Sequence, residues 1–198
     1  ETLQTTLGRA VHSMVTASFD AWIKFYRQDE NSPNTSISYY VKGSVVAFLL
    51  DARIRRVSSD KRSLDDVMRA AYAKYSGERG YSEQEFRALV EDVAGASLES
   101  FWSSALEGTA ELDYADALDA LGLRFKIAEP GDGKTPRKAT LGAITRIDGG
   151  RIVVSQVRRG TPSHEAGLNV DDEILAIDDF RVRPDQLDVR MEHYLAGG

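Results

Sequence analysis

The chain has 198 residues, of which 42% are hydrophobic, and this length allows one large or two small domains. With 31 acidic against 25 basic residues, it has no basic excess that would indicate a nucleic-acid partner. The absence of cysteine excludes disulfides, thiolate metal sites and a cysteine nucleophile, and no stretch reaches the roughly 20 apolar residues of a membrane-spanning helix. We therefore expect two domains without a nucleic-acid or membrane partner, and the compartment stays open.

The first 35 residues predict an amphipathic helix, a second short helix and a loop. Apolar residues recur at helical spacing from Leu3, which predicts an amphipathic helix to about residue 18. Asp20 is placed to cap a second helix over 21–26, because its carboxylate can accept from free backbone N–H groups. Residues 27–35 carry turn-forming side chains and predict a polar loop. This loop leads directly into the most apolar helix of the chain.

Two adjacent tyrosines stand at the start of that helix. Ser36 or Ser38 is placed to cap it, and it is predicted to run to about residue 57. Its segment 45–50 is apolar on every side, which is typical of a central helix packed by several neighbours. Because helical side chains lean toward the N-terminus, Tyr39 or Tyr40 would project off the end of this helix toward a cleft. The alternative is that both tyrosines are half-buried packing residues with solvated hydroxyls.

Further helices are indicated by their caps. Ser63 with Asp66, and Ser82 with Glu85, match the capping box, and Ser97 is a third candidate cap. A short last helix is predicted over 113–121. The glycines placed to end these helices are Gly77, Gly95, Gly108 and Gly122. Residues 1–121 are therefore predicted to form an all-α domain.

The remaining residues, 122–198, predict a small β-sheet domain with two helices, so that the whole chain is a multidomain protein of the α+β class. The predicted elements are a strand over 123–127, a flexible loop over 129–138, a hairpin over 141–157, a helix over 163–166, a strand pair over 173–182 and a helix from Pro184. The chain starts without Met and stops just after the last helical pattern. We therefore expect a piece of a longer protein, with the last strand of this sheet missing.

This second domain resembles the PDZ domains of bacterial proteases. The resemblance rests on Arg159-Gly-Thr-Pro-Ser-His-Glu-Ala-Gly-Leu168 and on Asp172-Glu-Ile-Leu-Ala-Ile177, and it spans nearly all of 123–198. Asp171 and Asp179 stand where that family prefers glycine, and aspartate tolerates the left-handed conformation better than most residues. We therefore expect a small local cost and not a different fold.

The resemblance implies a groove that binds the C-terminus of a peptide or protein. In such domains backbone amides hold the terminal carboxylate, and the peptide extends as an added strand along a sheet edge. The residues that match these positions are Leu141, Gly142, Ala143 and Ile144 in the loop and edge strand, with Leu187 and Met191 on the final helix. The alternative is that the same apolar residues are core, and that the domain serves as a cover or brace.

The first domain is similar to the glycyl aminopeptidases. The similarity lies in Phe19-Asp-Ala-Trp-Ile-Lys-Phe-Tyr-Arg27, Ser38-Tyr-Tyr-Val-Lys-Gly43 and Ser63-Leu-Asp-Asp-Val-Met-Arg69. Members of that family are zinc metallopeptidases with a thermolysin-like catalytic domain, followed by helices and a PDZ domain. A related aminopeptidase class carries Tyr-Glu-Lys-Gly, whose tyrosine donates to the oxyanion. Tyr40 matches this tyrosine and Tyr39 is the runner-up.

The zinc motif of that family, His-Glu-x-x-His, is absent from this chain. The histidines are His12, His164 and His193, and none lies four residues from another. The resemblance therefore implies the C-terminal portion of a peptidase whose missing N-terminal catalytic part is its partner and holds the zinc. We expect no cofactor and no activity in this portion alone. The alternatives are a non-catalytic peptide-binding PDZ module on a helical scaffold and, less favoured, the PDZ region of a serine protease.

Overall fold

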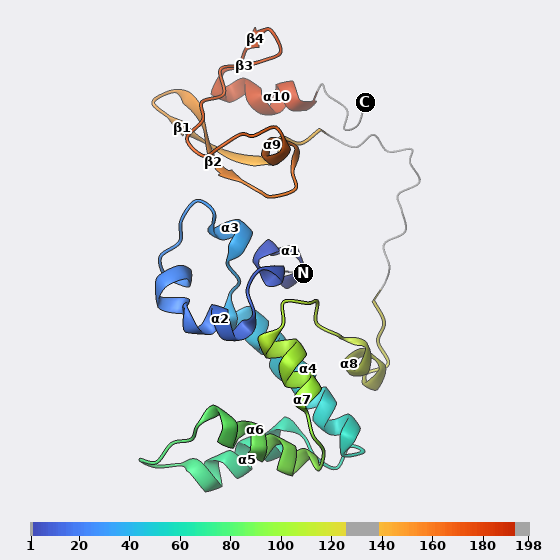
Figure 1. Ribbon diagram of the computed structural model, residues 1–198. Helices are drawn as coiled ribbons and strands as arrows, with labels where there is room; N and C mark the ends of the chain where they lie inside the picture. The colour runs from blue at the N-terminus through green and yellow to red at the C-terminus, as the bar shows by residue number, and fades with distance from the viewer. Residues whose placement is uncertain (1, 126–138, 193–198) are drawn as a thin grey trace.

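The computed structural model describes residues 2–125 and 139–192, which form a helical lobe (2–125) and a strand lobe (139–192) (Figure 1). The helical lobe consists of α1 (Thr2–Thr5), η1 (Leu7–Ala10), α2 (Met14–Phe19), η2 (Ala21–Phe25), α3 (Ser32–Thr35), α4 (Tyr39–Val57), α5 (Leu64–Tyr75), α6 (Glu83–Ala94), α7 (Glu99–Trp102), η3 (Ser103–Glu107) and α8 (Ala115–Ala120). The strand lobe consists of β1 (Ala143–Asp148), β2 (Arg151–Val157), α9 (Pro162–Glu165), β3 (Ala176–Ile177), β4 (Phe180–Arg181), η4 (Pro184–Gln186) and α10 (Leu187–Glu192). Helices followed by two small sheets match the predicted α+β class.

Helix α4 runs through the helical lobe and supplies its core (Figure 1). Ile54 is fully buried and packs with Val67 of α5, Val90 of α6 and Trp102 of α7. The prediction of a central helix packed by several neighbours is confirmed, because α4 contributes to two core clusters. It is not enclosed on every side, however, since Phe48 is 44% exposed. The helix therefore buries one broad stripe and leaves another face to solvent. Among the described residues, no helix is long and apolar enough to span a membrane.

Local capping chemistry sets several helix ends. Ser38 caps α4, with its hydroxyl accepting from the Val41 N–H at 3.3 Å. At α6 the predicted capping box is confirmed, because Ser82 Oγ accepts from Glu85 N and the Glu85 carboxylate accepts from Ser82 N. Gly95 is left-handed at the end of α6, as predicted, whereas Gly108 is extended. The N-cap residue of α7 is Leu98 and not Ser97, whose hydroxyl still accepts from the Glu99 N–H.

The predicted first helix is broken into α1, η1 and α2. Ser13 ends the first pieces and starts α2, because its hydroxyl accepts from the Thr16 N–H at 3.1 Å. Gly8 lies against the backbone just before α4, and a Cβ added there would stand 2.1 Å from the Ser36 carbonyl oxygen. The predicted cap at Asp20 is also wrong, because its carboxylate pairs with Lys24 and η2 is π-helical. These breaks fold the first 25 residues back onto the start of α4.

The predicted hairpin is confirmed in the strand lobe. Strands β1 and β2 are antiparallel, with Ile147 opposite Ile152, and a bulge lies between Ile144 and Thr145. Gly149 and Gly150 both have positive φ in the connecting turn, which favours glycine there. Strands β3 and β4 form a second two-stranded sheet.

Two details of the strand lobe test the expected left-handed positions. Asp171 is left-handed, with φ of 72°, as expected for a residue that stands in place of glycine. At the β3–β4 turn the left-handed residue is Asp178 and not Asp179.

The predicted strand at 123–127 is not formed where it is described. Leu123 to Phe125 have no regular secondary structure, and Phe125 packs edge-on against Tyr114 with ring centroids 5.5 Å apart. Residues 126 and 127, the loop at 129–138 and His193 lie outside the described residues. A segment with alternating side chains forms a strand only when a neighbouring strand can hydrogen-bond to its backbone. Here the ring of Phe125 packs on Tyr114 of the helical lobe instead.

Candidate functional site

Tyr39 and Tyr40 occupy the first turn of α4, directly after the Ser38 cap. Tyr39 is half-buried, and Tyr40 is 61% exposed. Their ring centroids are 4.2 Å apart, so the two phenols form one aromatic pair at the end of the buried helix. The free N–H groups of a helix start give this end a positive potential, which favours nearby negative charge.

A third tyrosine completes a phenol cluster, which we define as Tyr26, Tyr39 and Tyr40. The Tyr26 hydroxyl oxygen lies 3.0 Å from that of Tyr39 and 3.2 Å from that of Tyr40. Phe25 packs edge-on against Tyr39 and Tyr26, with centroids 5.5 Å and 5.2 Å away. The π-helical turn η2 therefore brings its end onto the start of α4.

The hydrogen bonds within the phenol cluster change the acidity of its members in opposite directions. The bond with the Tyr26 hydroxyl raises the pKa of Tyr39, and the neighbouring Tyr40 adds to this rise. The bond with Tyr26 lowers the pKa of Tyr40, with a further lowering by Tyr39 and a smaller opposing effect of desolvation. Tyr40 is therefore the more acidic phenol of the adjacent pair.

Lys42 lies one turn further along α4 and is buried. Only 2% of its surface is exposed, and its Nζ has no hydrogen-bond partner within the described residues. Burial lowers the pKa of this ammonium group, and the charge of Glu111 opposes the change. A desolvated cation at this depth raises the positive potential near the start of the helix.

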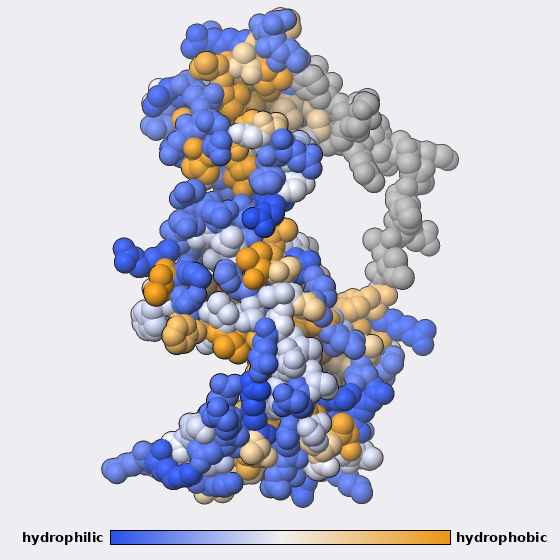
Figure 2. Space-filling model, viewed as in Figure 1, coloured by the Kyte–Doolittle hydropathy of each residue, from blue (hydrophilic) through white to orange (hydrophobic). Residues whose placement is uncertain are grey.

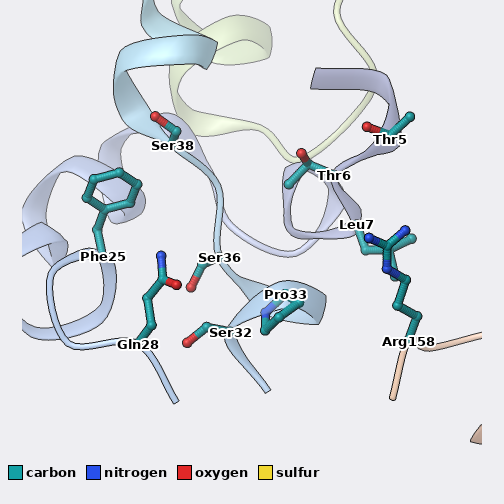
Figure 3. A pocket seen from close by; sticks show the side chains of 10 residues that line it. All are labelled: Thr5, Thr6, Leu7, Phe25, Gln28, Ser32, Pro33, Ser36, Ser38 and Arg158. Carbon is teal, nitrogen blue, oxygen red and sulfur yellow. The ribbon is translucent and has the colours of Figure 1, made fainter. Parts of the chain in front are cut away.

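A polar cavity of about 320 Å³ lies beside the phenol cluster, between the two lobes (Figure 3). Its lining residues are Thr5, Thr6, Leu7, Phe25, Gln28, Ser32, Pro33, Ser36, Ser38 and Arg158. Figure 3 shows the Arg158 side chain entering from the strand lobe beside Leu7. The cavity shares Phe25 and Ser38 with the surroundings of the tyrosines, but no phenol of the cluster lines it.

The side chain of Asn34, in α3, joins the two lobes. Its Nδ2 donates to the Val157 carbonyl at 2.9 Å, and its Oδ1 accepts from the Arg159 N–H at 2.9 Å. Nδ2 also donates to Asn31 Oδ1 at 3.0 Å. Asn34 is 6% exposed, so this side-chain amide is buried and fully paired. The five-residue stretch 34–38 therefore carries both the lobe contact, through Asn34, and the cap of α4, through Ser38.

The predicted groove residues all belong to the strand lobe, on the segment that leads into β1 and on α10. Leu141, Gly142 and Ala143 are half-buried before and at the start of β1, and Ile144 is exposed. Gly142 has φ of 75°, and its N–H donates to the Thr140 hydroxyl at 3.2 Å. Leu187 and Met191 are half-buried on α10. Within the described ranges β1 pairs only with β2, so its other edge is open.

Metal-ligating side chains do not gather in the parts of the chain that the structure describes. Over 2–125 and 139–192, no three His, Asp or Glu side chains come together as a metal site would require. His12 is half-buried after η1, and His164 is exposed on α9. The donor set in these ranges does not fit zinc, which needs at least three such ligands at one point.

The chain is similar to known aminopeptidases. Residues 1–46 match the family model of the M61 glycyl aminopeptidases. The fold is similar to the crystal structure of an aminopeptidase N family protein from Idiomarina loihiensis, with a TM-score of 0.75 and 26% sequence identity. That similarity covers 99% of this chain, which spans 35% of the length of the other protein. A comparison with curated proteins gives no match.

The comparisons support the resemblance to an aminopeptidase family over the part of the chain that carries the phenol cluster. Sequence reasoning singled out Tyr39 and Tyr40 but missed Tyr26 and Asn34. The signal for Tyr26 was the aromatic run that includes Trp22 and Phe25. For Asn34 no local signal existed beyond its position in a polar loop.

Proposed function

We propose that this chain is the helical and PDZ-like part of a glycyl-aminopeptidase-like peptidase that hydrolyses peptide bonds. The observation that carries the proposal is that the phenol cluster falls inside the residues that match the M61 family model. In this function Tyr40 donates a hydrogen bond to the oxygen that becomes negative when a peptide carbonyl is attacked. One such preorganised donor is typically worth about 10²–10³ in kcat.

The surface formed by the end of α2 and by η2 supports a role as part of a larger assembly. Phe19, Trp22 and Ile23 are 87%, 79% and 70% exposed, although such side chains are normally covered. Figure 2 shows apolar side chains at the surface beside α2. We propose that the catalytic part of the same peptidase covers this face and stands against Tyr40. Since the His, Asp and Glu side chains of residues 2–125 and 139–192 do not fit zinc, we assign any metal ligands to that catalytic part and no catalytic step to a metal within these ranges.

The proposal predicts no peptidase turnover by the 198-residue chain alone. The assay incubates the chain with zinc and glycyl peptides and compares release of glycine with a metal-free control. Turnover clearly above that control would contradict the assignment of the metal ligands to another part.

In the longer peptidase we expect Tyr40→Phe to lower kcat by about 10²–10³ while bound zinc, measured by atomic absorption, stays unchanged. The matched control is Tyr72→Phe, because Tyr72 is 77% exposed on α5 and loses the same hydroxyl. Equal kcat values for the Tyr40→Phe and control proteins would refute the role of Tyr40.

A second candidate function is binding of a peptide C-terminus by the strand lobe. The observation that favours it is the open edge of β1 with half-buried Leu187 and Met191 on α10. A fluorescent peptide with a free C-terminal carboxylate tests this by polarisation. Binding that is lost on amidation of the peptide and on Leu187→Lys supports the groove, and equal polarisation in all arms excludes it.

A further inference from the structure

The hydroxyl of Tyr26 lies between those of Tyr39 and Tyr40, so it can hydrogen-bond to both. Both oxygen–oxygen distances, 3.0 Å and 3.2 Å, allow hydrogen bonds. Each phenol has one proton to donate. Three protons therefore serve two bonds, and one proton is left for a partner outside the cluster.

The order of donation decides which phenol keeps that free proton. If Tyr40 donates to Tyr26 and Tyr26 donates to Tyr39, the Tyr40 proton is committed inside the cluster. If both Tyr39 and Tyr40 donate to the two lone pairs of Tyr26, the Tyr40 proton is committed as well. If Tyr39 donates to Tyr26 and Tyr26 donates to Tyr40, Tyr40 only accepts within the cluster and its own proton is free. Tyr40 is the exposed member of the pair and Tyr39 the half-buried one, so a substrate can reach the proton of Tyr40 more readily.

We propose that Tyr26 is a positioning residue. Its hydroxyl accepts a hydrogen bond from Tyr39 and donates one to Tyr40, so that the Tyr40 hydroxyl is free to donate to a peptide carbonyl oxygen. This inference rests on the proposed function and selects Tyr40 over Tyr39. The opposite pKa directions of the two tyrosines agree with it. A phenol that donates a hydrogen bond loses its proton less readily, in line with the raised pKa of Tyr39. A phenol that accepts one is stabilised as the phenolate, in line with the lowered pKa of Tyr40.

The test in the longer peptidase is Tyr26→Phe, which keeps the ring that packs on Phe25 and Trp22 and removes only the hydroxyl. Loss of one hydrogen bond to the donor is expected to lower kcat about tenfold with an unchanged KM. The alkaline limb of kcat should move to higher pH, because the donor is lost when Tyr40 ionises and its pKa returns toward the ordinary value. Tyr72→Phe is the matched control. Both orders in which Tyr40 donates to Tyr26 predict an unchanged or raised kcat, because the Tyr40 proton would be released, and either result would overturn the proposal.

A second measurement on the 198-residue chain separates this inference from the proposed function. Phenolate absorbance is titrated for four proteins, namely the wild type, Tyr40→Phe, Tyr26→Phe and the double variant, with circular dichroism to show that each is folded. The titration of Tyr40→Phe subtracted from that of the wild type gives the curve of Tyr40 with Tyr26 present. The titration of the double variant subtracted from that of Tyr26→Phe gives the curve of Tyr40 without it. We expect a higher midpoint without Tyr26, and equal midpoints would overturn the inference. If the midpoint shifts while Tyr40→Phe leaves the turnover of the longer peptidase intact, the proposed role fails and the hydrogen-bond order stands.

Discussion

The contact through Asn34 predicts how firmly the strand lobe is held to the helical lobe. Asn34→Ala removes three hydrogen bonds, two of which cross to Val157 and Arg159. Each bond contributes about 1 kcal/mol net, and a backbone group left unpaired adds a penalty of about 1–3 kcal/mol. Because the Arg159 N–H is only partly buried, its penalty lies at the low end of this range. We therefore expect Asn34→Ala to weaken the contact between the lobes by about 3 kcal/mol, which raises the fraction of molecules with separated lobes roughly 100-fold.

The readout is amide hydrogen exchange at Arg159, since this N–H donates directly to Asn34. We expect exchange about 100-fold faster in Asn34→Ala, while amides of the α4–α6 core keep their rates. Asn169→Ala is the matched control, because its amide donates only within its own loop, to the Gly167 carbonyl. Unchanged protection of Arg159 in Asn34→Ala, or an equal effect in the control, would show that the lobes are held by other contacts.

Three further changes test the packing of the helical lobe, each by urea unfolding. Ile54→Ala should cost about 2–5 kcal/mol, because Ile54 is fully buried, whereas Phe48→Ala on the same helix should cost less; equal losses would contradict the assigned core. Gly8→Ala should destabilise by about 1–3 kcal/mol or more, because the added Cβ meets the carbonyl of Ser36 at 2.1 Å, and a neutral result would mean that this backbone approach is easily relaxed. Lys42→Met should remove a pH dependence: burial lowers the pKa of Lys42 in the folded state, so the unfolded chain binds more protons and wild-type stability rises between that lowered pKa and 10.5. Parallel stability curves for the two proteins across this range would refute the burial of a charged amine.

Much of the fold could be predicted because its signals are local. The side chains of Ser82 and Glu85 each accept a hydrogen bond from the other residue's backbone N–H, so both partners lie within four residues of sequence. The turn at Gly149 and Gly150 sets the hairpin through the positive φ of these two residues. The strand predicted at 123–127 does not form over its described residues, 123–125. Alternating apolar and charged side chains do not show whether a second strand is available to pair with them. Likewise, the helical spacing from Leu3 did not reveal that the Ser13 hydroxyl would start a new helix.

The candidate site depends on contacts that a sequence pattern does not contain. The motif pointed to Tyr39 and Tyr40, but only the fold of η2 brings Tyr26 between their hydroxyls. Asn34 bonds to a carbonyl 123 residues away, and its loop position gave no sign of that partner. Local rules therefore find the helix that carries the phenols, and the tertiary fold supplies the groups that orient them.

The two tryptophans of the chain stand in opposite environments, which makes them separate optical reporters. Trp22 is 79% exposed on η2, beside Tyr26, whereas Trp102 is 3% exposed in the core. A soluble quencher such as acrylamide will therefore extinguish the red-shifted emission of Trp22 first. Covering of the η2 face by another part of the peptidase can then be followed as lost quenching, while the blue-shifted emission of Trp102 reports separately whether the helices remain packed.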